Sequence, residues 1–231
     1  LEKEYKSFVR NGANLNLESK EKLRKIDAEL SQLSLTFGEN VLADTQAFHL
    51  HIEKEGDLKG LPSAIIEMAA EEAQSRQKTG WVFTLDYPSY VPFMTYSENR
   101  VLRKKFSLAF GQRGFQDNPR NNSEVIKKII QLRKKRANLL GYKSHAAFVL
   151  EERMAQSEEN VKNFLDKLSE KSKPAAEKEW ENMKVFAFKN LNIVQLEKWD
   201  IAYVSEKLKQ VELDLDEQQL KPYFKLEMVL E

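Results

Sequence analysis

The sequence predicts a mainly α-helical fold with a small antiparallel β-sheet. Long stretches space apolar residues three or four positions apart, which places them on one face of an α-helix. Three shorter stretches, at about residues 47–53, 81–85 and 93–96, have the alternation or the aromatic content typical of strands. With 231 residues, 41% of them hydrophobic and 32% charged, the chain is long enough to form one large or two modest folded domains.

A long amphipathic helix is predicted from about Leu17 to Ala43. Its apolar residues step by three or four positions: Leu23, Ile26, Leu30, Leu33, Phe37 and Val41. Shorter helices are expected from Pro62 to the stop signal at Thr79–Gly80 and from Ser97 to about Phe110, with the short strands between and beside them. The first half of the chain therefore mixes helices with the predicted sheet.

The stretch from Asn121 to Ala155 carries the clearest helix signals. Asn122 or Ser123 is expected to cap its first helix, because a short polar side chain accepts the free amides of the first turn. Gly141 is expected to end that helix in the left-handed conformation, and Ser144 to cap a second one. The first helix has an apolar face made of Val125, Ile126, Ile129, Ile130, Leu132 and Leu139. This pattern predicts a buried helical hairpin.

Further helices are expected toward residue 231. Ser157 is predicted to cap the next one. Pro174 is predicted to kink or break it, because proline lacks the backbone donor and crowds the preceding turn. Asp216 is expected to cap a last short turn before Pro222.

A polar loop at residues 111–122 contains Asn118–Pro119, which is a turn or linker signal. We therefore expect two regions, with the sheet in residues 1–116 and helices alone in residues 117–231.

The formal net charge of +1 gives no field that would attract nucleic acid or an anionic membrane. The absence of cysteine excludes disulfides and thiolate metal sites. No apolar run is long enough to span a bilayer and no signal peptide is visible, so a cytoplasmic location is expected.

The histidines are the first candidates for chemistry. His49 and His51 share one face of the predicted strand with Glu53, a spacing that suits either a metal site or two surface histidines. Zinc needs three or four converging ligands, so we expect no metal there. His145, near a helix start, is interpreted as a cap or packing residue rather than a general base, because no nucleophile or orienting acid accompanies it.

Three other patterns have both a functional and a structural interpretation. The basic run Arg133–Arg136 suits phosphate contacts, but a solvated helix face is favoured. Trp199, Asp200 and Tyr203 suggest a packed aromatic pair, with Asp200 supporting a helix start. The aromatic and proline residues from Trp81 to Tyr96 suit either a peptide groove at a sheet edge or simple protection of that edge.

Four stretches together resemble the thimet-oligopeptidase family of zinc metallopeptidases, of the bacterial peptidyl-dipeptidase and oligopeptidase A type. They are W-V-F-T-L-D-Y-P-S-Y from Trp81, L-L-G-Y-K-S-H-A-A-F from Leu139 with R-M-A from Arg153, W-D-I-A-Y from Trp199, and K-P-Y-F-K-L-E from Lys221. The family usually has a second tyrosine where this chain has Val204, so a contact made by that tyrosine is not expected here. The resemblance extends over nearly the whole chain.

The resemblance implies an enzyme that hydrolyses short peptides inside a narrow channel, using zinc held by an H-E-x-x-H helix. This chain contains no H-E-x-x-H, and its histidines are His49, His51 and His145. We therefore expect a non-catalytic part of such an enzyme: channel wall, with no catalytic, cofactor-binding or metal-binding residue of its own. Zinc would belong to the rest of the polypeptide, and the partners would be short peptides and that remaining part.

The alternative is a free-standing helical module, without catalysis, that binds peptides or proteins through its aromatic edge and charged exterior. Features of the two ends favour a part of a longer polypeptide. Leu1 is not an initiator methionine, and an apolar pattern at Leu226, Val229 and Leu230 stops unfinished. Sequence alone does not separate a peptidyl-dipeptidase from an endopeptidase.

Overall fold

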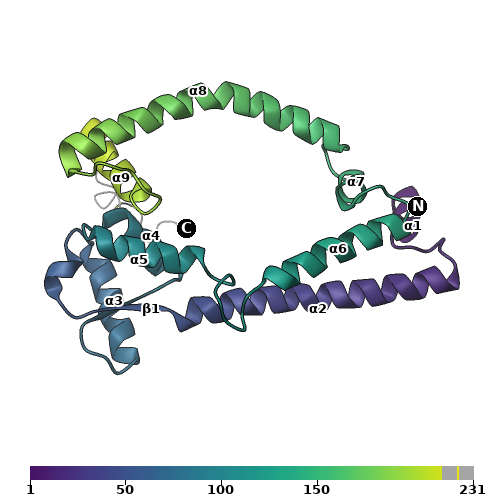
Figure 1. Cartoon of the computed structure of the whole chain (residues 1–231), viewed down its shortest axis with the longest axis horizontal. Helices are drawn as coiled ribbons and strands as arrows, with labels where there is room; N and C mark the ends of the chain where they lie inside the picture. Colours follow the sequence, from purple (N-terminus) through teal and green to yellow (C-terminus); the bar gives the residue numbers. More distant parts are fainter. Residues whose placement is uncertain (215–222, 224–231) are drawn as a thin grey trace. The chain divides into compact units, whose positions relative to one another are not determined.

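The computed structural model describes residues 1–214 and Tyr223 (Figure 1). The described part is mainly helical with a two-stranded antiparallel sheet, which confirms the predicted fold class. In chain order the helices and strands are α1 (Glu2–Arg10), α2 (Leu17–Ala47), β1 (His49–Ile52), a 3-10 turn (Glu55–Leu58), α3 (Ser63–Ser75), β2 (Trp81–Thr84), α4 (Tyr87–Tyr96), α5 (Arg100–Gly111), α6 (Ser123–Leu139), α7 (His145–Leu150), α8 (Glu158–Leu191) and α9 (Ile201–Leu213).

The chain forms two compact units, each built from two stretches. Unit 1 contains Leu1–Asp44 and Gln112–Pro174. Unit 2 contains Thr45–Gly111 and the described residues from Ala175 onward. The division expected after residue 116 stays a prediction. The predicted turn at Asp216 and the apolar residues near residue 230 lie outside the described residues.

Helices α2 and α6 of unit 1 lie side by side and run in opposite directions (Figure 1). Arg136 donates to Asp27 over 2.6 Å at one end of the pair. At the other end, Asn40 donates to the side-chain oxygen of Asn122 over 2.8 Å. Asn122 is buried and also donates to the carbonyl of Phe37 over 3.1 Å. The side chain of Asn122 thus bonds to α2 and does not cap α6. The amide of Ser123 instead donates to the side-chain oxygen of Asn121.

The turn from α6 to α7 has the predicted chemistry. Gly141 has a φ of +87°, in the left-handed region, and the hydroxyl of Ser144 accepts from the amide of Ala147 over 2.9 Å. The prediction of a buried hairpin is wrong for its second helix, because α7 has no fully buried residue. Phe148 instead packs against charged groups, with the guanidinium carbons of Arg10 and Arg136 4.4 and 4.9 Å from its ring centroid.

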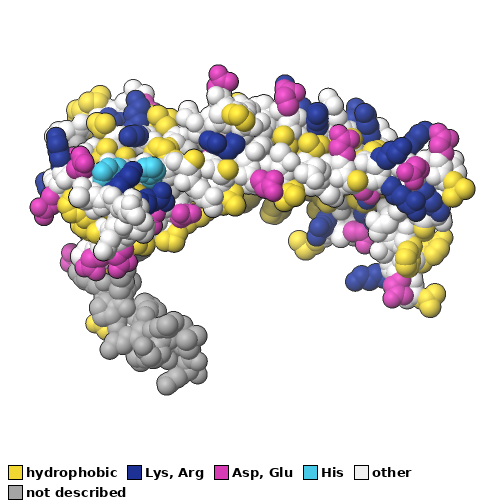
Figure 2. Space-filling view, turned by 90° about the horizontal axis from the view of Figure 1, so that it is seen from below, with side chains coloured by type: hydrophobic (Ala, Val, Ile, Leu, Met, Phe, Trp, Pro, Cys, Tyr) yellow, Lys and Arg dark blue, Asp and Glu magenta, His cyan; other side chains and the backbone are white. Residues whose placement is uncertain are grey.

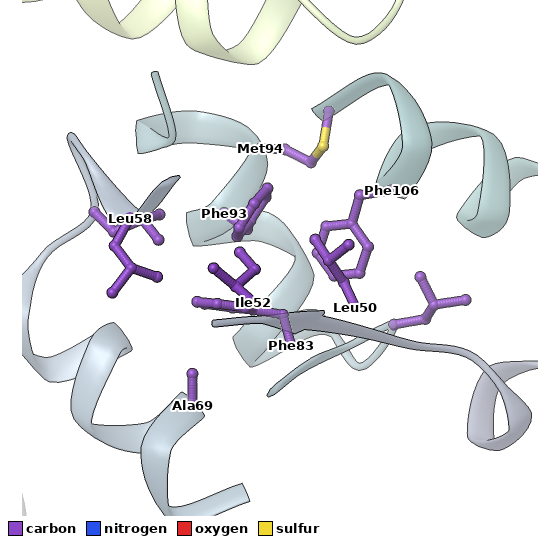
Figure 3. Close-up of a cluster of buried hydrophobic side chains, with 10 residues drawn as sticks. Leu50, Ile52, Leu58, Ala69, Phe83, Phe93, Met94 and Phe106 are labelled. Atoms are coloured by element: carbon purple, nitrogen blue, oxygen red, sulfur yellow. The ribbon is translucent and has the colours of Figure 1, made fainter. Parts of the chain in front are cut away.

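Unit 2 is organised around the sheet. Leu50 pairs with Phe83 in the antiparallel ladder. The rings of Phe93 and Phe106 lie edge-on to each other with centroids 5.0 Å apart, and Phe93 lies 4.8 Å from Phe83 in the same way. Figure 3 shows Phe93 and Phe106 on one side of the sheet and Ala69, from α3, on the other. Helices of unit 2 therefore lie on both sides of the sheet, with α3 packed against β2.

The prediction of a third strand at residues 93–96 is wrong. These residues form the second half of α4, which begins after Asp86 with Pro88 in its first turn. Proline fits there because first-turn amides have no helical acceptor. The helix places Tyr90, Phe93 and Met94 at positions i, i+3 and i+4, so that all three pack against the core. Burial of this aromatic face decides for the helix over the strand propensity.

At Pro174 a break is absent, because α8 continues through this residue to Leu191, and the alternative of a kink stays a prediction. Proline removes one backbone hydrogen bond, which a long helix can lose without ending when its neighbouring turns remain bonded. Among the described helices, none is both long and apolar enough to cross a membrane.

Replacement of Phe106 by alanine is expected to lower the free energy of unfolding by about 3–5 kcal/mol, because it opens a cavity among the rings. Its side chain is completely buried. Val101 of the same helix is 76% exposed, so Val101→Ala is expected to change stability by less than about 0.5 kcal/mol. Urea denaturation of both variants gives the comparison, and equal losses would contradict this account of the core.

Candidate functional site

A buried, extensively hydrogen-bonded polar cluster of unit 2 is centred on Asp200, in the loop that joins α8 to α9. Its side chain is fully buried. Arg100 donates to both carboxylate oxygens, through Nε over 3.0 and 3.1 Å and through Nη2 over 2.7 Å. Arg103 donates through Nη2 to the Oδ1 atom over 2.9 Å. Because Arg100 and Arg103 lie one turn apart on α5, both guanidinium groups reach the same carboxylate.

Arg103 is itself almost completely buried, at 1% exposure, so its charge requires full compensation. Its Nη1 donates to the carbonyl of Ser97 over 2.7 Å, and its Nε donates to the carbonyl of Trp199 over 3.1 Å. Its guanidinium carbon lies 4.1 Å from the ring centroid of Tyr203, on α9. The cluster therefore ties α5, the α8–α9 loop and α9 together.

The electrostatics of the cluster favour the ion pair. Burial alone would raise the pKa of the Asp200 carboxyl, but hydrogen bonds from Arg100 and Arg103 outweigh it and hold that pKa below its ordinary value. Burial raises the pKa of the Tyr203 hydroxyl, so its ring meets Arg103 as a neutral phenol. With both guanidinium groups engaged and the carboxylate sealed from solvent, the arrangement suits a structural clamp and not proton transfer to a substrate.

The residues around Asp200 differ in detail from the sequence interpretation. Its side chain makes no capping bond to α9 and instead accepts the amide of Glu197 over 3.2 Å. Trp199 lies under a cation as Tyr203 does, with the Lys104 ammonium 5.0 Å from its ring centroid. Arg100 and Arg103 were not predicted as site residues, although their i, i+3 spacing on a predicted helix was a visible signal in the sequence.

His49 and His51 lie on the same face of β1, as predicted, and Figure 2 shows histidines beside lysine and arginine side chains. The Lys78 ammonium is 2.7 Å from Nε2 of His49 and donates to it. Nε2 of His51 is 2.6 Å from the carbonyl oxygen of Thr79, to which it can only donate. Burial, together with the charges of Lys78 and Arg76, holds the pKa of His49 below its ordinary value.

These contacts bear on the zinc that the family resemblance implies. In both histidines the Nε2 atom is already engaged, and an ammonium group occupies the position a metal would take at His49. Within residues 1–214, no three acidic, histidine or cysteine side chains come together as a metal site would require. The described residues do not fit a catalytic zinc ion.

Two further candidates, His145 and the basic run Arg133–Arg136, lie in unit 1. His145 is the first residue of α7, and its Nδ1 atom is buried without a hydrogen-bond partner. Burial and the charges of Arg133 and Arg136 lower its pKa. Within the basic run, Arg136 forms the ion pair with Asp27 that joins α6 to α2.

The segment from Trp81 to Tyr96 forms one side of a small cavity of about 180 Å³ beside β2, lined by Met68, Ala69, Glu72, Val82, Thr84, Asp86, Pro88 and Ser89. The amide of Thr84 donates to the hydroxyl of Ser89 over 3.0 Å. An edge amide that already has an acceptor offers less to an added peptide strand. The contact favours protection of this edge.

The geometry of these residues does not identify the family of the protein, but comparison with known proteins does. Residues 93–231 match the model of peptidase family M3. The chain belongs to this family. The match includes α5 and the Asp200 cluster, so the clamp is part of an M3 fold.

The sequences of individual relatives match nearly the full length of the chain. Oligopeptidase A of Haemophilus influenzae is 36% identical over 97% of the chain. The probable cytosolic oligopeptidase A of Arabidopsis thaliana is 34% identical over all of it, and the dipeptidyl carboxypeptidase of Escherichia coli is 27% identical over 98%. The chain spans about a third of the length of these relatives.

Replacement of Asp200 by asparagine is expected to lower the free energy of unfolding by about 3–5 kcal/mol near pH 7, because it leaves the buried Arg103 charge uncompensated. The native carboxyl pKa is lowered, so its contribution is complete above the unfolded pKa of about 3.9 and is lost as the pH falls through the folded pKa. The difference between native protein and variant should therefore shrink below about pH 4. Asp166→Asn, at an exposed position of α8, is the control. A difference independent of pH would contradict the ion pair.

Replacement of Lys78 by methionine is expected to raise the pKa of His49 toward its ordinary value, because the ammonium beside Nε2 is removed. The rise should be incomplete, since burial is the larger cause of the lowered pKa. NMR titration of the imidazole measures it, with Lys105→Met on the exposed surface of α5 as the control. An unchanged His49 titration in Lys78→Met would show that the contact does not exist in solution.

Proposed function

We propose that this chain is a non-catalytic portion of a zinc metallopeptidase that hydrolyses short peptides. Membership of peptidase family M3 is the observation that carries the proposal. Relatives that match nearly all of the chain are called oligopeptidases and a dipeptidyl carboxypeptidase, and the chain spans about a third of their length. In this proposal the remaining length supplies the catalytic groups.

The chemistry of the described residues supports a structural share in the enzyme. A zinc peptidase of this kind needs a metal-bound water, a general base and groups that stabilise the developing oxyanion. No H-E-x-x-H occurs in the 231 residues, and His49 and His51 are engaged by Lys78 and Thr79. What the described residues supply instead is rigidity, through the Asp200 clamp and the aromatic core of unit 2.

In the proposed enzyme the two units form part of the wall of a channel that admits extended peptides and excludes folded proteins. Their contribution to catalysis is to keep the wall in place, so that a bound peptide is held in a productive geometry. Short peptides, the rest of the polypeptide and a cytoplasmic location are the partners and setting that go with this function. Nucleic acid and membrane have no part in it.

A second candidate function is a peptide- or protein-binding module without catalysis. The observation in its favour is the apolar surface of unit 1, where Ile130 is 61% exposed and Ile126 is 41% exposed. Exposed apolar patches of this kind mark interaction surfaces in folded proteins. The two candidates differ in whether the interaction partner is another molecule or the same polypeptide.

The test compares the 231-residue chain with the full-length protein encoded by its gene. Both are dialysed against trace zinc, analysed for metal, and assayed with a short quenched peptide with and without a chelator. The full-length protein is expected to hold zinc and cleave the peptide, and the 231-residue chain to do neither. Chelator-sensitive cleavage by the chain alone would overturn the proposal, as would a full-length protein that never cleaves.

A further inference from the structure

Unit 1 carries an apolar groove between α2 and α6. The groove has a volume of about 460 Å³ and is lined by Ser34, Phe37, Ile126, Ile129, Ile130 and Arg133. Ile130 is 61%, Ile126 41% and Phe37 39% exposed. All three are helix residues on the side where the two helices meet, so the exposed surface is continuous and not a set of scattered side chains.

Gly38 of α2 lies four residues after Ser34, and therefore on the same face of the helix as this groove residue. Glycine inside a helix is less stable than alanine, because it loses more backbone freedom on folding. A β-carbon added at Gly38 would meet nothing within 4 Å, so no neighbour in the described structure requires a glycine there. A backbone that approaches α2 closely from outside would require it.

Unit 1 is also poor in buried apolar side chains of its own. Among its described residues these are Leu23, Leu132 and Ala137. Helices α2 and α6 each direct one apolar side toward the other, and two packed helices leave the sides of that contact open to solvent. A third helix laid along the groove would close it.

We propose that a helix from the part of the same polypeptide outside residues 1–231 packs into this groove and approaches the α2 backbone at Ser34 and Gly38. This inference rests on the proposed function, in which the chain is part of a longer enzyme. About two thirds of the length of the M3 relatives lies outside the region that this chain matches. A tethered helix has a high effective concentration at the groove, which favours it over a separate partner. An acidic side chain on this helix would pair with Arg133 at the edge of the groove.

The test measures the solvent accessibility of single introduced cysteines in the full-length protein. The 231 residues contain no cysteine, so Ile130→Cys and Lys128→Cys each place one thiol at a known position of α6. Lys128 is exposed and, two residues from Ile130, projects from the opposite side of the helix. The rate of maleimide labelling at each site is read by mass spectrometry of the digested protein.

In the full-length protein Ile130→Cys is expected to react about tenfold more slowly than Lys128→Cys, or slower still, because a packed helix blocks access to the thiol. In the 231-residue chain the two rates are expected to be similar. Equal, rapid labelling of both sites in the full-length protein would overturn the inference. So would protection that disappears on dilution, which would identify a second copy of the chain, or protection that appears only when another protein is added.

A second variant tests the close approach. Gly38→Leu in the full-length protein is expected to speed the labelling of Ile130→Cys, because the larger side chain holds the incoming helix away. Gln32→Leu, at an exposed position about a third of a turn away on α2, should leave the rate unchanged. A Gly38→Leu protein that labels as slowly as its parent would contradict the proposed contact.

The peptide-cleavage assay on the same full-length preparation keeps the two proposals separate. Cleavage with an accessible Ile130→Cys would leave the proposed function standing and remove this inference. A protected Ile130→Cys in a full-length protein that cleaves nothing would support the packed helix and remove the proposed function.

Discussion

The ion pairs that the buried carboxylate of Asp200 forms with Arg100 and Arg103 hold several segments of unit 2 together. Two guanidinium groups from one helix converge on this carboxylate, and one of them, Arg103, is as thoroughly buried as the carboxylate itself. Removing charges from water is unfavourable unless each finds partners, so this cluster holds only while α5, the α8–α9 loop and α9 keep their positions. The ion cluster thereby specifies one arrangement of these segments.

Unit 1 is stabilised in a different way. Polar contacts at the two ends of α6, Asp27 with Arg136 and Asn40 with Asn122, join it to α2, and only a few apolar side chains of unit 1 are buried. A pair of helices cannot enclose a core, because each has solvent on the sides that its partner does not cover. The exposed isoleucines of α6 and the glycine within α2 are consistent with a layer that belongs to a larger fold. The chain spans about a third of the length of its M3 relatives, and in the proposed enzyme the remaining length would supply the rest of such a fold.

The candidate chemistry shows where sequence reasoning stops. The alternation around His49 and His51 correctly predicted that both lie on one face of a strand. It did not indicate that Lys78, 29 residues after His49 in the chain, would donate to that histidine. Asp200 was recognised at the start of a helix, but its arginine partners lie about a hundred residues earlier. Periodicity predicts which residues share a face of a helix or strand, but it does not predict which residues that face contacts.

By itself the sequence determined the fold class, the family, the caps at Gly141 and Ser144 and the two paired strands, because these depend on local periodicity, turn chemistry and recognisable stretches of residues. Only the tertiary structure decided that residues 93–96 are helical, that α8 runs through Pro174 and that Asn122 fastens a neighbouring helix. In these places local preference is worth about 1 kcal/mol or less per residue, apart from proline at about 3. At residues 93–96 and at Asn122, burying an aromatic face or satisfying a buried amide outweighs this preference, and neither contribution can be assigned before the partner is known.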